Sequence, residues 1–214
     1  RWVLMAPTFK QATDLHADAL EADLTGDGEW SWLGAKINRT KWRISFPGGG
    51  WIQLFGAENA HAARGLRTDG LALDECDDVD LDVFDSVLSP WFSEPWSLKQ
   101  RLICGTPRRG RHGLLYRTFR RATAPDLTER AGEHFALHAT GYDTPDTVDR
   151  AYLDKMRLET PPATFEREYR CSFDAGEGLV YAQFDERLHV RDPDEGTAWT
   201  EVLVGADHGW EDPG

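Results

Sequence analysis

Leu71-Ala72-Leu73-Asp74-Glu75 is the most informative stretch of the chain, because three apolar residues run directly into two adjacent carboxylates. A short apolar run of this kind predicts a buried strand of a parallel sheet. Ligands of such sheets lie at the carboxyl ends of the strands, which is where Asp74 and Glu75 fall. In nucleotide hydrolysis, one carboxylate there helps to hold Mg²⁺ and the next orients or deprotonates the attacking water. The alternative is an acidic helix start, since more aspartates follow.

Apolar runs and amphipathic periods alternate along the rest of the chain. The pattern predicts strands at residues 1–6, 70–74, 101–104 and 133–138, and helices at residues 10–24, 80–88, 112–121 and 148–158. A β-hairpin is expected where Pro47-Gly48-Gly49-Gly50 separates residues 42–46 from residues 51–55. Thr160 is expected to cap a further helix that starts at Pro161. Strands that alternate with helices predict an α/β fold with a mostly parallel sheet.

Two other predicted strands end in residues that suit the same kind of site. Cys104-Gly105-Thr106-Pro107 ends the strand at 101–104, and a threonine there could sense a phosphate or a water molecule across the site. Met5-Ala6-Pro7-Thr8 follows the first strand, and a turn of this type often touches nucleic acid in helicase-like ATPases. Taken alone, the first segment is weak evidence beside the alternative of an ordinary Gly-Pro loop, and the second is better explained by a proline that ends a strand.

Residues 105–112 have the glycine spacing of a phosphate-binding P-loop but lack its lysine and its hydroxyl residue. The glycines have the G-x-x-x-x-G-K-[ST] spacing, but Arg111 replaces the lysine and His112 replaces the Mg²⁺-binding hydroxyl. An imidazole does not substitute for a hydroxyl on a hard, oxygen-preferring ion. No other match occurs in the 214 residues, so ATP hydrolysis would require a P-loop N-terminal to Arg1. Apolar strands are also predicted at both ends of the chain, which indicates a fragment cut inside a domain at each end.

Composition narrows the possible classes of protein. The chain carries a net charge of −13 and is 40% hydrophobic, with nine Trp and ten Phe, which excludes a disordered acidic tail. No apolar run is long enough to cross a bilayer. Three widely spaced cysteines argue against a disulfide framework and against a structural zinc site. Several tryptophans are expected to pack rather than to stack on a ligand: Trp30, Trp32, Trp42, Trp51, Trp91 and Trp96.

Charge is segregated along the chain. Residues 69–85 contain eight acids and no Lys or Arg, whereas residues 99–121 contain eight bases and no acid. Three of these bases share one face of the predicted helix at 112–121 and are candidates for contacts with nucleic-acid phosphates: Arg117, Arg120 and Arg121. An ordinary solvated helix face is the alternative for these arginines.

Several short motifs occur in a recognisable order. They are Met5-Ala6-Pro7-Thr8, Arg64-Gly65, Leu71-Ala72-Leu73-Asp74-Glu75, Gly105-Thr106-Pro107, a Phe-x-x-Glu-Tyr pattern within residues 165–173, Gly178-Leu179-Val180-Tyr181 and Val204-Gly205-Ala206-Asp207. In order and spacing, the chain resembles the large terminase subunit of tailed bacteriophages, the motor and nuclease that packages DNA into procapsids. The resemblance covers nearly the whole chain, and no single motif is decisive.

The resemblance implies a P-loop NTPase-type, RecA-like sheet flanked by helices, with a β-hairpin insertion. The start of a ribonuclease H-like domain would follow. Residues 1–160 would then be a partial ATPase domain, residues 161–178 a linker, and residues 179–214 the beginning of the nuclease.

The resemblance also implies roles for individual residues. Asp74 would be the Walker B residue near Mg²⁺, Glu75 the catalytic carboxylate, and Gly105-Thr106-Pro107 the motif that couples ATP hydrolysis to DNA movement. Arg64 matches a position proposed for an arginine finger, with a salt bridge to the acidic segment as the alternative. Asp207 would be the first metal-binding carboxylate of a nuclease that uses two Mg²⁺ or Mn²⁺ ions, with a plain turn aspartate as the alternative.

Cofactors and partners follow from the same resemblance. ATP and Mg²⁺ would be the cofactors, and double-stranded DNA, a portal protein and a small terminase subunit the partners. A homo-oligomeric ring without membrane contact, in the cytoplasm of the bacterial host, is implied as well. The 214 residues by themselves are expected neither to hydrolyse ATP nor to cut DNA, because the P-loop and the other nuclease carboxylates are missing.

Two alternatives stay open at this point. Asp74-Glu75-Cys76-Asp77 spells the DECD box of some superfamily 2 helicases, although nothing like the Ser-Ala-Thr motif follows it. The other alternative is a non-enzymatic nucleic-acid-binding remnant, whose function would rest on the basic residues 99–121.

Overall fold

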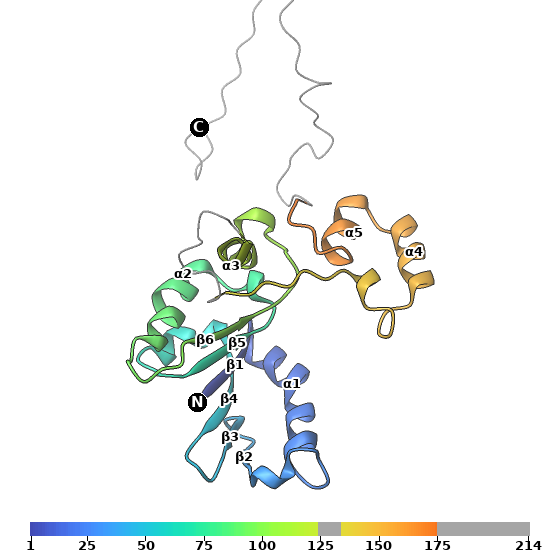
Figure 1. The fold of residues 1–214 in the computed structure, drawn as a ribbon. Coiled ribbons are helices and arrows are strands. Elements are labelled where there is room, and N and C mark those ends of the chain that lie inside the picture. Colours follow the sequence, from blue (N-terminus) through green and yellow to red (C-terminus); the bar gives the residue numbers. More distant parts are fainter. Residues whose placement is uncertain (124–133, 175–214) are drawn as a thin grey trace, which may run out of the picture. The chain divides into compact units, whose positions relative to one another are not determined.

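The computed structural model describes residues 1–123 and 134–174, and its centre is a six-stranded sheet (Figure 1). The strands lie in the order β2-β3-β4-β1-β5-β6. They are β1 (Trp2–Ala6), β2 (Lys36–Asn38), β3 (Arg43–Ser45), β4 (Trp51–Gly56), β5 (Gly70–Leu73) and β6 (Gln100–Ile103). β1 pairs in parallel with β4 and β5, and β5 pairs in parallel with β6, whereas β2, β3 and β4 pair antiparallel. The predicted α/β class with a mostly parallel sheet is confirmed.

β1 and β5 form the buried centre of the sheet because both are almost entirely apolar. Val3, Met5, Leu71 and Leu73 are each at most 1% exposed. Continuous apolar runs of this kind are typical of parallel strands that helices cover on both faces. The register sets Met5 opposite Leu73, so the next residue, Asp74, lies just past the carboxyl end of the paired region.

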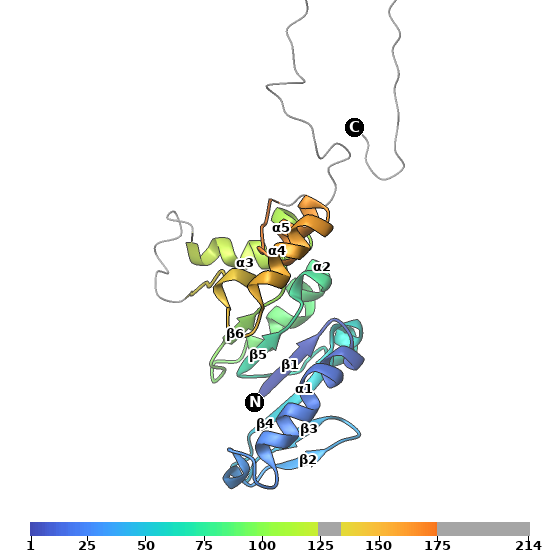
Figure 2. The same cartoon turned by 90° about the vertical axis from the view of Figure 1, so that its right-hand side faces the viewer.

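α1 (Phe9–Leu24) covers one face of the sheet (Figure 2). Its buried alanines, Ala12 and Ala17, pack against Ala6 and Leu54 of the sheet. Thr8 caps the helix through a capping box with Gln11, in which each side chain bonds to the other residue's backbone amide. The strand predicted at 1–6 and the helix predicted at 10–24 are both confirmed. Only a short turn separates them, because the cap of the helix follows directly after β1.

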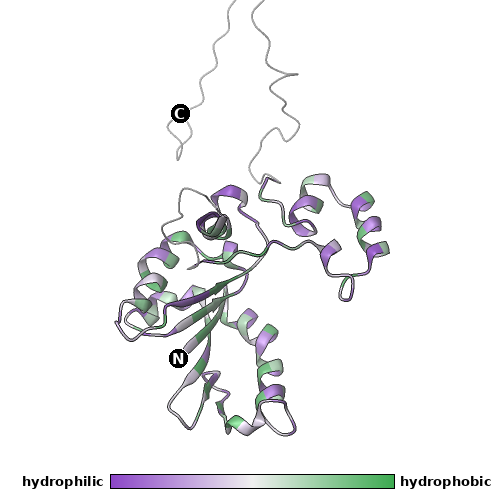
Figure 3. Cartoon of the chain, in the orientation of Figure 1, coloured by the Kyte–Doolittle hydropathy of each residue, from purple (hydrophilic) through white to green (hydrophobic). Residues whose placement is uncertain are grey.

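The other face is covered by a series of short helices. They are η2 (Ala57–Ala63), η3 (Cys76–Asp78), α2 (Leu81–Val83), η4 (Phe84–Leu88) and η5 (Ser89–Phe92). The helix predicted at 80–88 therefore exists, but it begins as α-helix and continues as π-helix and 3-10 helix. The main core lies between these short helices and the sheet. It includes Trp91, which is fully buried and meets the Phe55 ring edge-on, with 6.3 Å between the ring centroids. Figure 3 shows apolar residues along the central strands.

The predicted hairpin is confirmed, with β3 and β4 antiparallel across the Pro-Gly turn. Gly49 takes a positive φ of 82°, and the Phe46 amide donates to the Gly50 carbonyl. The sequence pattern missed β2, a three-residue strand that extends the hairpin. The packing role predicted for the tryptophans is confirmed for Trp51 and Trp91. It is wrong for three others, which are exposed: Trp30 (46%), Trp96 (44%) and Trp32 (73%), the last on the short helix η1 (Ser31–Leu33).

The last strand is followed by η6 (Gly110–His112) and α3 (Leu114–Thr123), which confirms a helix close to the predicted 112–121. The strand predicted at 133–138 is not formed by its described residues, 134–138: only His134 makes an isolated β-bridge, and none of them belongs to a strand of the six-stranded sheet. Phe135 and Leu137 there are 88% and 77% exposed, so nothing described covers their apolar side chains.

Residues 134–174 contain three helices: η8 (Gly141–Asp143), α4 (Arg150–Glu159) and α5 (Pro162–Glu168). The helix expected at 148–158 is therefore confirmed. Thr160 does not cap α5 as expected. Its amide donates to the Met156 carbonyl and closes α4, while Pro161 takes the cap position of α5 without a side-chain bond.

The nuclease start predicted for residues 179–214 lies outside the described residues, and so do Asp207 and the segments matched at 178–181 and 204–207. The predicted boundary between ATPase domain and linker stays a prediction. Within the described ranges, the structure contains no helix with the length and apolar character needed to span a membrane.

Candidate functional site

Three polar strand ends meet at one edge of the sheet. The Asp74 amide donates to the Met5 carbonyl at 2.8 Å, and the Cys104 amide donates to the Leu73 carbonyl at 3.0 Å. These bonds join β1, β5 and β6 at their carboxyl ends, where α/β sheets bind their ligands. Asp74, Glu75 and the Gly105-Thr106-Pro107 loop are therefore brought together.

The Asp74 carboxylate has a defined set of neighbours. Its Oδ1 accepts from the Glu75 amide at 3.0 Å and lies 3.5 Å from the Cys104 thiol. Burial, together with the Asp74 charge, raises the pKa of Cys104 to about 11, so the thiol stays protonated and donates. The other carboxylate oxygen of Asp74, Oδ2, lies 3.3 Å from Nε2 of His16, on α1. No spacing in the sequence relates His16 to the strand that carries Asp74, so this contact could not be predicted from the sequence.

Glu75 adopts a conformation that is uncommon for a side-chain-bearing residue. Its φ of 47° and ψ of 48° lie in the left-handed region. Burial is the main cause that raises the pKa of Glu75, and the adjacent Asp74 charge adds to it, while the Thr106 amide and Arg108 act in the opposite direction. A half-buried carboxylate with a raised pKa is suited to accept a proton from water.

Gly105 allows the loop after β6 to approach this turn. Its φ of 145° is outside the range that other residues adopt easily, and a Cβ there would lie 3.0 Å from the Cα of Glu75. The Cys76 amide donates to the Cys104 carbonyl at 3.1 Å, which holds the two strand ends together. The glycine of the predicted coupling motif is thus needed for a close backbone approach beside Glu75.

The oxygen donors of the site are the carboxylates of Asp74 and Glu75, and Mg²⁺ prefers such ligands. In residues 1–123 and 134–174, no three His, Cys, Asp or Glu side chains are grouped so that they could hold a metal ion. This donor set fits an ion that completes its coordination shell with substrate phosphates and water, as Mg²⁺ usually does.

Arg64 follows η2 and is exposed. Its backbone amide bonds to the His61 carbonyl, and the described residues offer its side chain no ion pair or hydrogen bond. The alternative of a salt bridge to the acidic segment is therefore not realised among those residues. The finger role remains a prediction.

The three arginines proposed to contact nucleic acid differ in their surroundings. Arg117 forms a two-pronged ion pair with Asp85, at 2.7 and 2.8 Å, and lies over the Phe84 ring. The Arg117 guanidinium lowers the pKa of Asp85, so this carboxylate stays ionised. Arg120 and Arg121 are exposed at the end of α3. The charge of Arg117 is thus already balanced, whereas Arg120 and Arg121 have no ion pair with a described residue.

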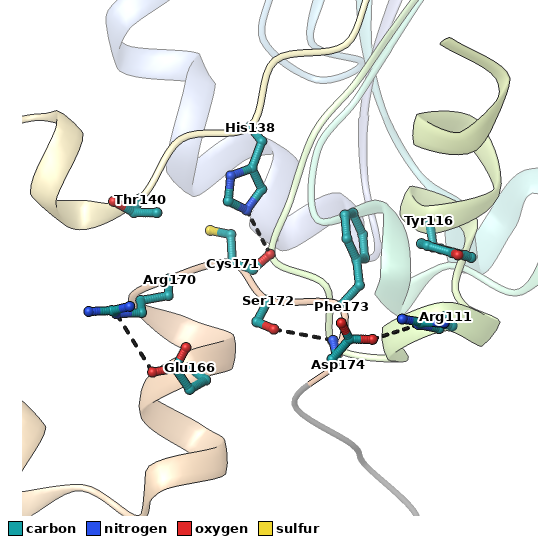
Figure 4. A pocket seen from close by; sticks show the side chains of 10 residues that line it. All are labelled: Arg111, Tyr116, His138, Thr140, Glu166, Arg170, Cys171, Ser172, Phe173 and Asp174. Carbon is teal, nitrogen blue, oxygen red and sulfur yellow. Dashed lines mark hydrogen bonds and ion pairs between the residues drawn. The ribbon is translucent and has the colours of Figure 1, made fainter. Parts of the chain in front are cut away.

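A cavity of about 380 Å³ lies beside residues 138–140 and 166–174, and several charged side chains line it (Figure 4). Arg111 is paired with Asp174 at 2.6 Å, and Arg170 with Glu166 at 3.6 Å. His138 Nε2 lies 3.1 Å from the Cys171 carbonyl oxygen. The charged side chains that line this cavity are therefore paired with one another, and it holds neither Asp74 nor Glu75.

Known proteins share both sequence and fold with this chain. The large terminase subunit of Escherichia phage T5 is 28% identical over 181 residues, which are 79% of this chain but 39% of that protein. The ATPase domain of the Thermus phage P74-26 large terminase has a TM-score of 0.63 at 20% identity, with 80% of this chain and 76% of that one covered. The chain has the fold of a large terminase ATPase domain.

A third relative is the large terminase of another thermophilic bacteriophage, solved in complex with ATP-gamma-S. It has a TM-score of 0.55 at 17% identity, and the match covers 90% of this chain and 45% of that one. No protein-family model matches. The resemblance to large terminases is confirmed, and the chain spans about two fifths of the length of the T5 terminase.

Proposed function

We propose that this chain is part of the ATPase of a phage large terminase and that its strand ends form one side of an ATP site. The observation that carries the proposal is the placement of Asp74 and Glu75 against the Gly105-Thr106-Pro107 loop, in a fold shared with terminase ATPase domains. The terminase of the thermophilic bacteriophage that was solved with ATP-gamma-S shares this fold and has also been solved with ADP.

In the proposed site, each residue has a distinct task. Asp74 would hold Mg²⁺, which supplies charge neutralisation for the phosphates. Glu75 orients the attacking water and accepts its proton, a task that its raised pKa favours. Thr106 lies beside Glu75 and would sense whether the γ-phosphate is still present after hydrolysis. Arg64, from the same or a neighbouring subunit, would stabilise the negative charge of the transition state.

The proposal needs a phosphate-binding loop, and none of the 214 residues provides one. We expect the strand that would carry it to pair with β6. β6 lies at one edge of the sheet, and Leu102 on this strand is 60% exposed. A groove of about 450 Å³ runs between β6 and α3 and is lined by Leu102, Phe119 and Leu137. A parallel strand paired to β6 would cover these apolar side chains, and its carboxyl end would lie at the same edge of the sheet as Glu75.

We also propose that the intact protein takes part in DNA packaging. The intact protein would form a ring that moves double-stranded DNA into procapsids, together with a portal protein and a small terminase subunit. Asp207 would belong to an endonuclease domain that cuts concatemeric DNA with two Mg²⁺ or Mn²⁺ ions. Similarity to the T5 terminase supports these roles, since that similarity includes 79% of the chain.

The test is ATP hydrolysis by the full-length gene product with and without nucleic acid. We expect turnover that needs Mg²⁺, stops with a chelator and rises with duplex DNA. The 214 residues alone should show no turnover. Unwinding that RNA stimulates would favour the superfamily 2 helicase, and salt-sensitive DNA binding without any hydrolysis would favour the non-enzymatic module.

The arginines of α3 give a separate prediction about DNA. Replacing both Arg120 and Arg121 by Ala should lower the slope of log affinity against log salt for duplex DNA by about 2, because each phosphate contact contributes about 0.9. Arg117→Ala should change this slope by less than about 0.5, since Asp85 already balances Arg117. An unchanged slope in the variant that lacks all three arginines would show that α3 does not face DNA.

A further inference from the structure

Asp77 is a charged residue buried in the wall of the candidate site. It is 1% exposed, and it lies two residues after Glu75 in η3. Its Oδ1 accepts from the Leu115 amide at 2.8 Å, and its Oδ2 accepts from the Arg109 amide at 3.1 Å. Both donors belong to the segment that follows the Gly105-Thr106-Pro107 loop. A buried carboxylate is stable only with partners of this kind, so the two bonds fix Asp77 firmly.

The segment after β6 is shaped to receive this carboxylate. A Cβ at Gly113 would lie 2.4 Å from both carboxylate oxygens of Asp77, so no larger residue fits there without displacing it. Leu115 is in the first turn of α3, where the amides of a helix lack partners within the helix and attract negative charge. Asp77 therefore supplies, from a distant part of the chain, the cap that α3 lacks.

Asp77 also acts on Glu75 through the backbone between them. Glu75 holds a left-handed conformation that costs about 1 kcal/mol or more and persists only where its surroundings enforce it. On the near side, its amide is bonded to Asp74. On the far side, the Cys76 amide is bonded to the Cys104 carbonyl and the Asp78 amide to the Glu75 carbonyl, at 3.1 and 3.0 Å. Asp77 anchors this far side to the loop and to α3.

We infer that Asp77 is a positioning residue, which holds Glu75 in its strained conformation and in register with the Gly105-Thr106-Pro107 loop and α3. The inference rests on the proposed ATPase for its catalytic consequence. Asp77 itself lies away from the reacting atoms and acts through Glu75. Its two hydrogen bonds connect the turn that carries Glu75 to the loop after β6 and to the start of α3.

The variant Asp77→Asn tests this inference, because it has the same shape as the native residue. Both carboxylate oxygens accept from amides, so an Asn must turn its NH₂ group toward one of two donors and lose that bond. In the full-length gene product we expect kcat for ATP to fall by about 10- to 100-fold, while KM for ATP changes less than about 3-fold. Gly113→Ala should show the same division between kcat and KM, because it displaces Asp77 without changing any charge.

The matched control is Asp78→Asn, one residue along, which removes the surface ion pair with Arg108 and a minor electrostatic effect on Glu75 but leaves the bonds of Asp77 in place. Its effect on kcat should stay within about 3-fold, as expected for an exposed pair. Equal losses in the Asp77 and Asp78 variants, or a loss in KM alone, would overturn the positioning role.

Amide hydrogen exchange in the 214-residue chain gives a result that needs no activity. Exchange at the Cys76 and Asp78 amides, which flank Glu75, should be about 10-fold faster in Asp77→Asn and in Gly113→Ala than in the native chain or in Asp78→Asn. If exchange changes as expected and the native gene product does not hydrolyse ATP, the proposed function fails while the structural role of Asp77 stands. If exchange at these amides is unchanged, the inference is wrong.

Discussion

Replacing Glu75 by Gln is expected to lower the ATP turnover of the full-length gene product by at least about 100-fold, which is the usual contribution of a general base. The amide has nearly the same shape but accepts no proton from the attacking water. ATP affinity should stay within about 3-fold, because the proposed role of Glu75 is in the reaction and not in binding. The measurements are steady-state hydrolysis and direct titration with nucleotide.

The same substitution should stabilise the fold at neutral pH. Burial and the Asp74 charge raise the pKa of Glu75, so the folded state holds this proton more tightly than the unfolded chain does. The stability that this group contributes is therefore present at acidic pH and is lost as the pH rises through the raised pKa. Gln carries no ionisable proton and avoids that loss.

Thermal unfolding of the 214-residue chain at two pH values checks this sign. Tm of Glu75→Gln minus Tm of the native chain should be positive at pH 7 and close to zero near pH 4. Glu159→Gln is the control, since Glu159 lies at the exposed end of α4 with only a long contact to Lys155, and its Tm difference should be small at both pH values. A lower Tm for Glu75→Gln at pH 7, or ATP turnover close to native, would contradict the role assigned to Glu75.

Trp91→Ala is expected to lower the free energy of unfolding by about 3–5 kcal/mol, the largest loss of stability that we predict for this chain. Trp91 is fully buried under the sheet and packs edge-on against Phe55, so truncation leaves a cavity in the main core. Most domains have a stability of about 5–15 kcal/mol, and this variant would lose a large part of it. The measurement is urea denaturation, in which the dependence of the unfolding free energy on urea concentration is compared between variants.

Two further tryptophan variants make the prediction specific. Trp32→Ala is the same substitution at a side chain that is 73% exposed, and it should change stability by less than about 0.5 kcal/mol. Trp91→Phe keeps most of the apolar volume and removes an indole Nε1 that has no hydrogen-bond partner among the described residues. It should therefore cost much less than Trp91→Ala. Similar losses for Trp91→Ala and Trp32→Ala would mean that the core is not packed around Trp91.

The strands, the first helix and the hairpin could be predicted from the sequence because their signals are local. An apolar run between turn residues is enough to predict β1 or β5, and Pro47 with three glycines is enough to predict the hairpin. Local signals were insufficient where a segment depends on its neighbours. Residues 134–138 alternate like a strand, yet strand formation needs a paired edge, and the sheet does not include them. Trp32 is apolar, but apart from a ring contact with the nearby Trp30 it stays 73% exposed.

The location of the chemistry can be predicted from local sequence, since the apolar strand Gly70–Leu73 must deliver Asp74 and Glu75 to the carboxyl edge of a parallel sheet. The surroundings of these carboxylates depend on the fold. It placed His16 beside Asp74, paired Arg117 with Asp85, and buried Asp77 against amides 32 and 38 residues away. The physical reason is that a strand end follows from the local period of apolar residues, whereas the partner of a buried charge depends on which distant segments the fold brings into contact.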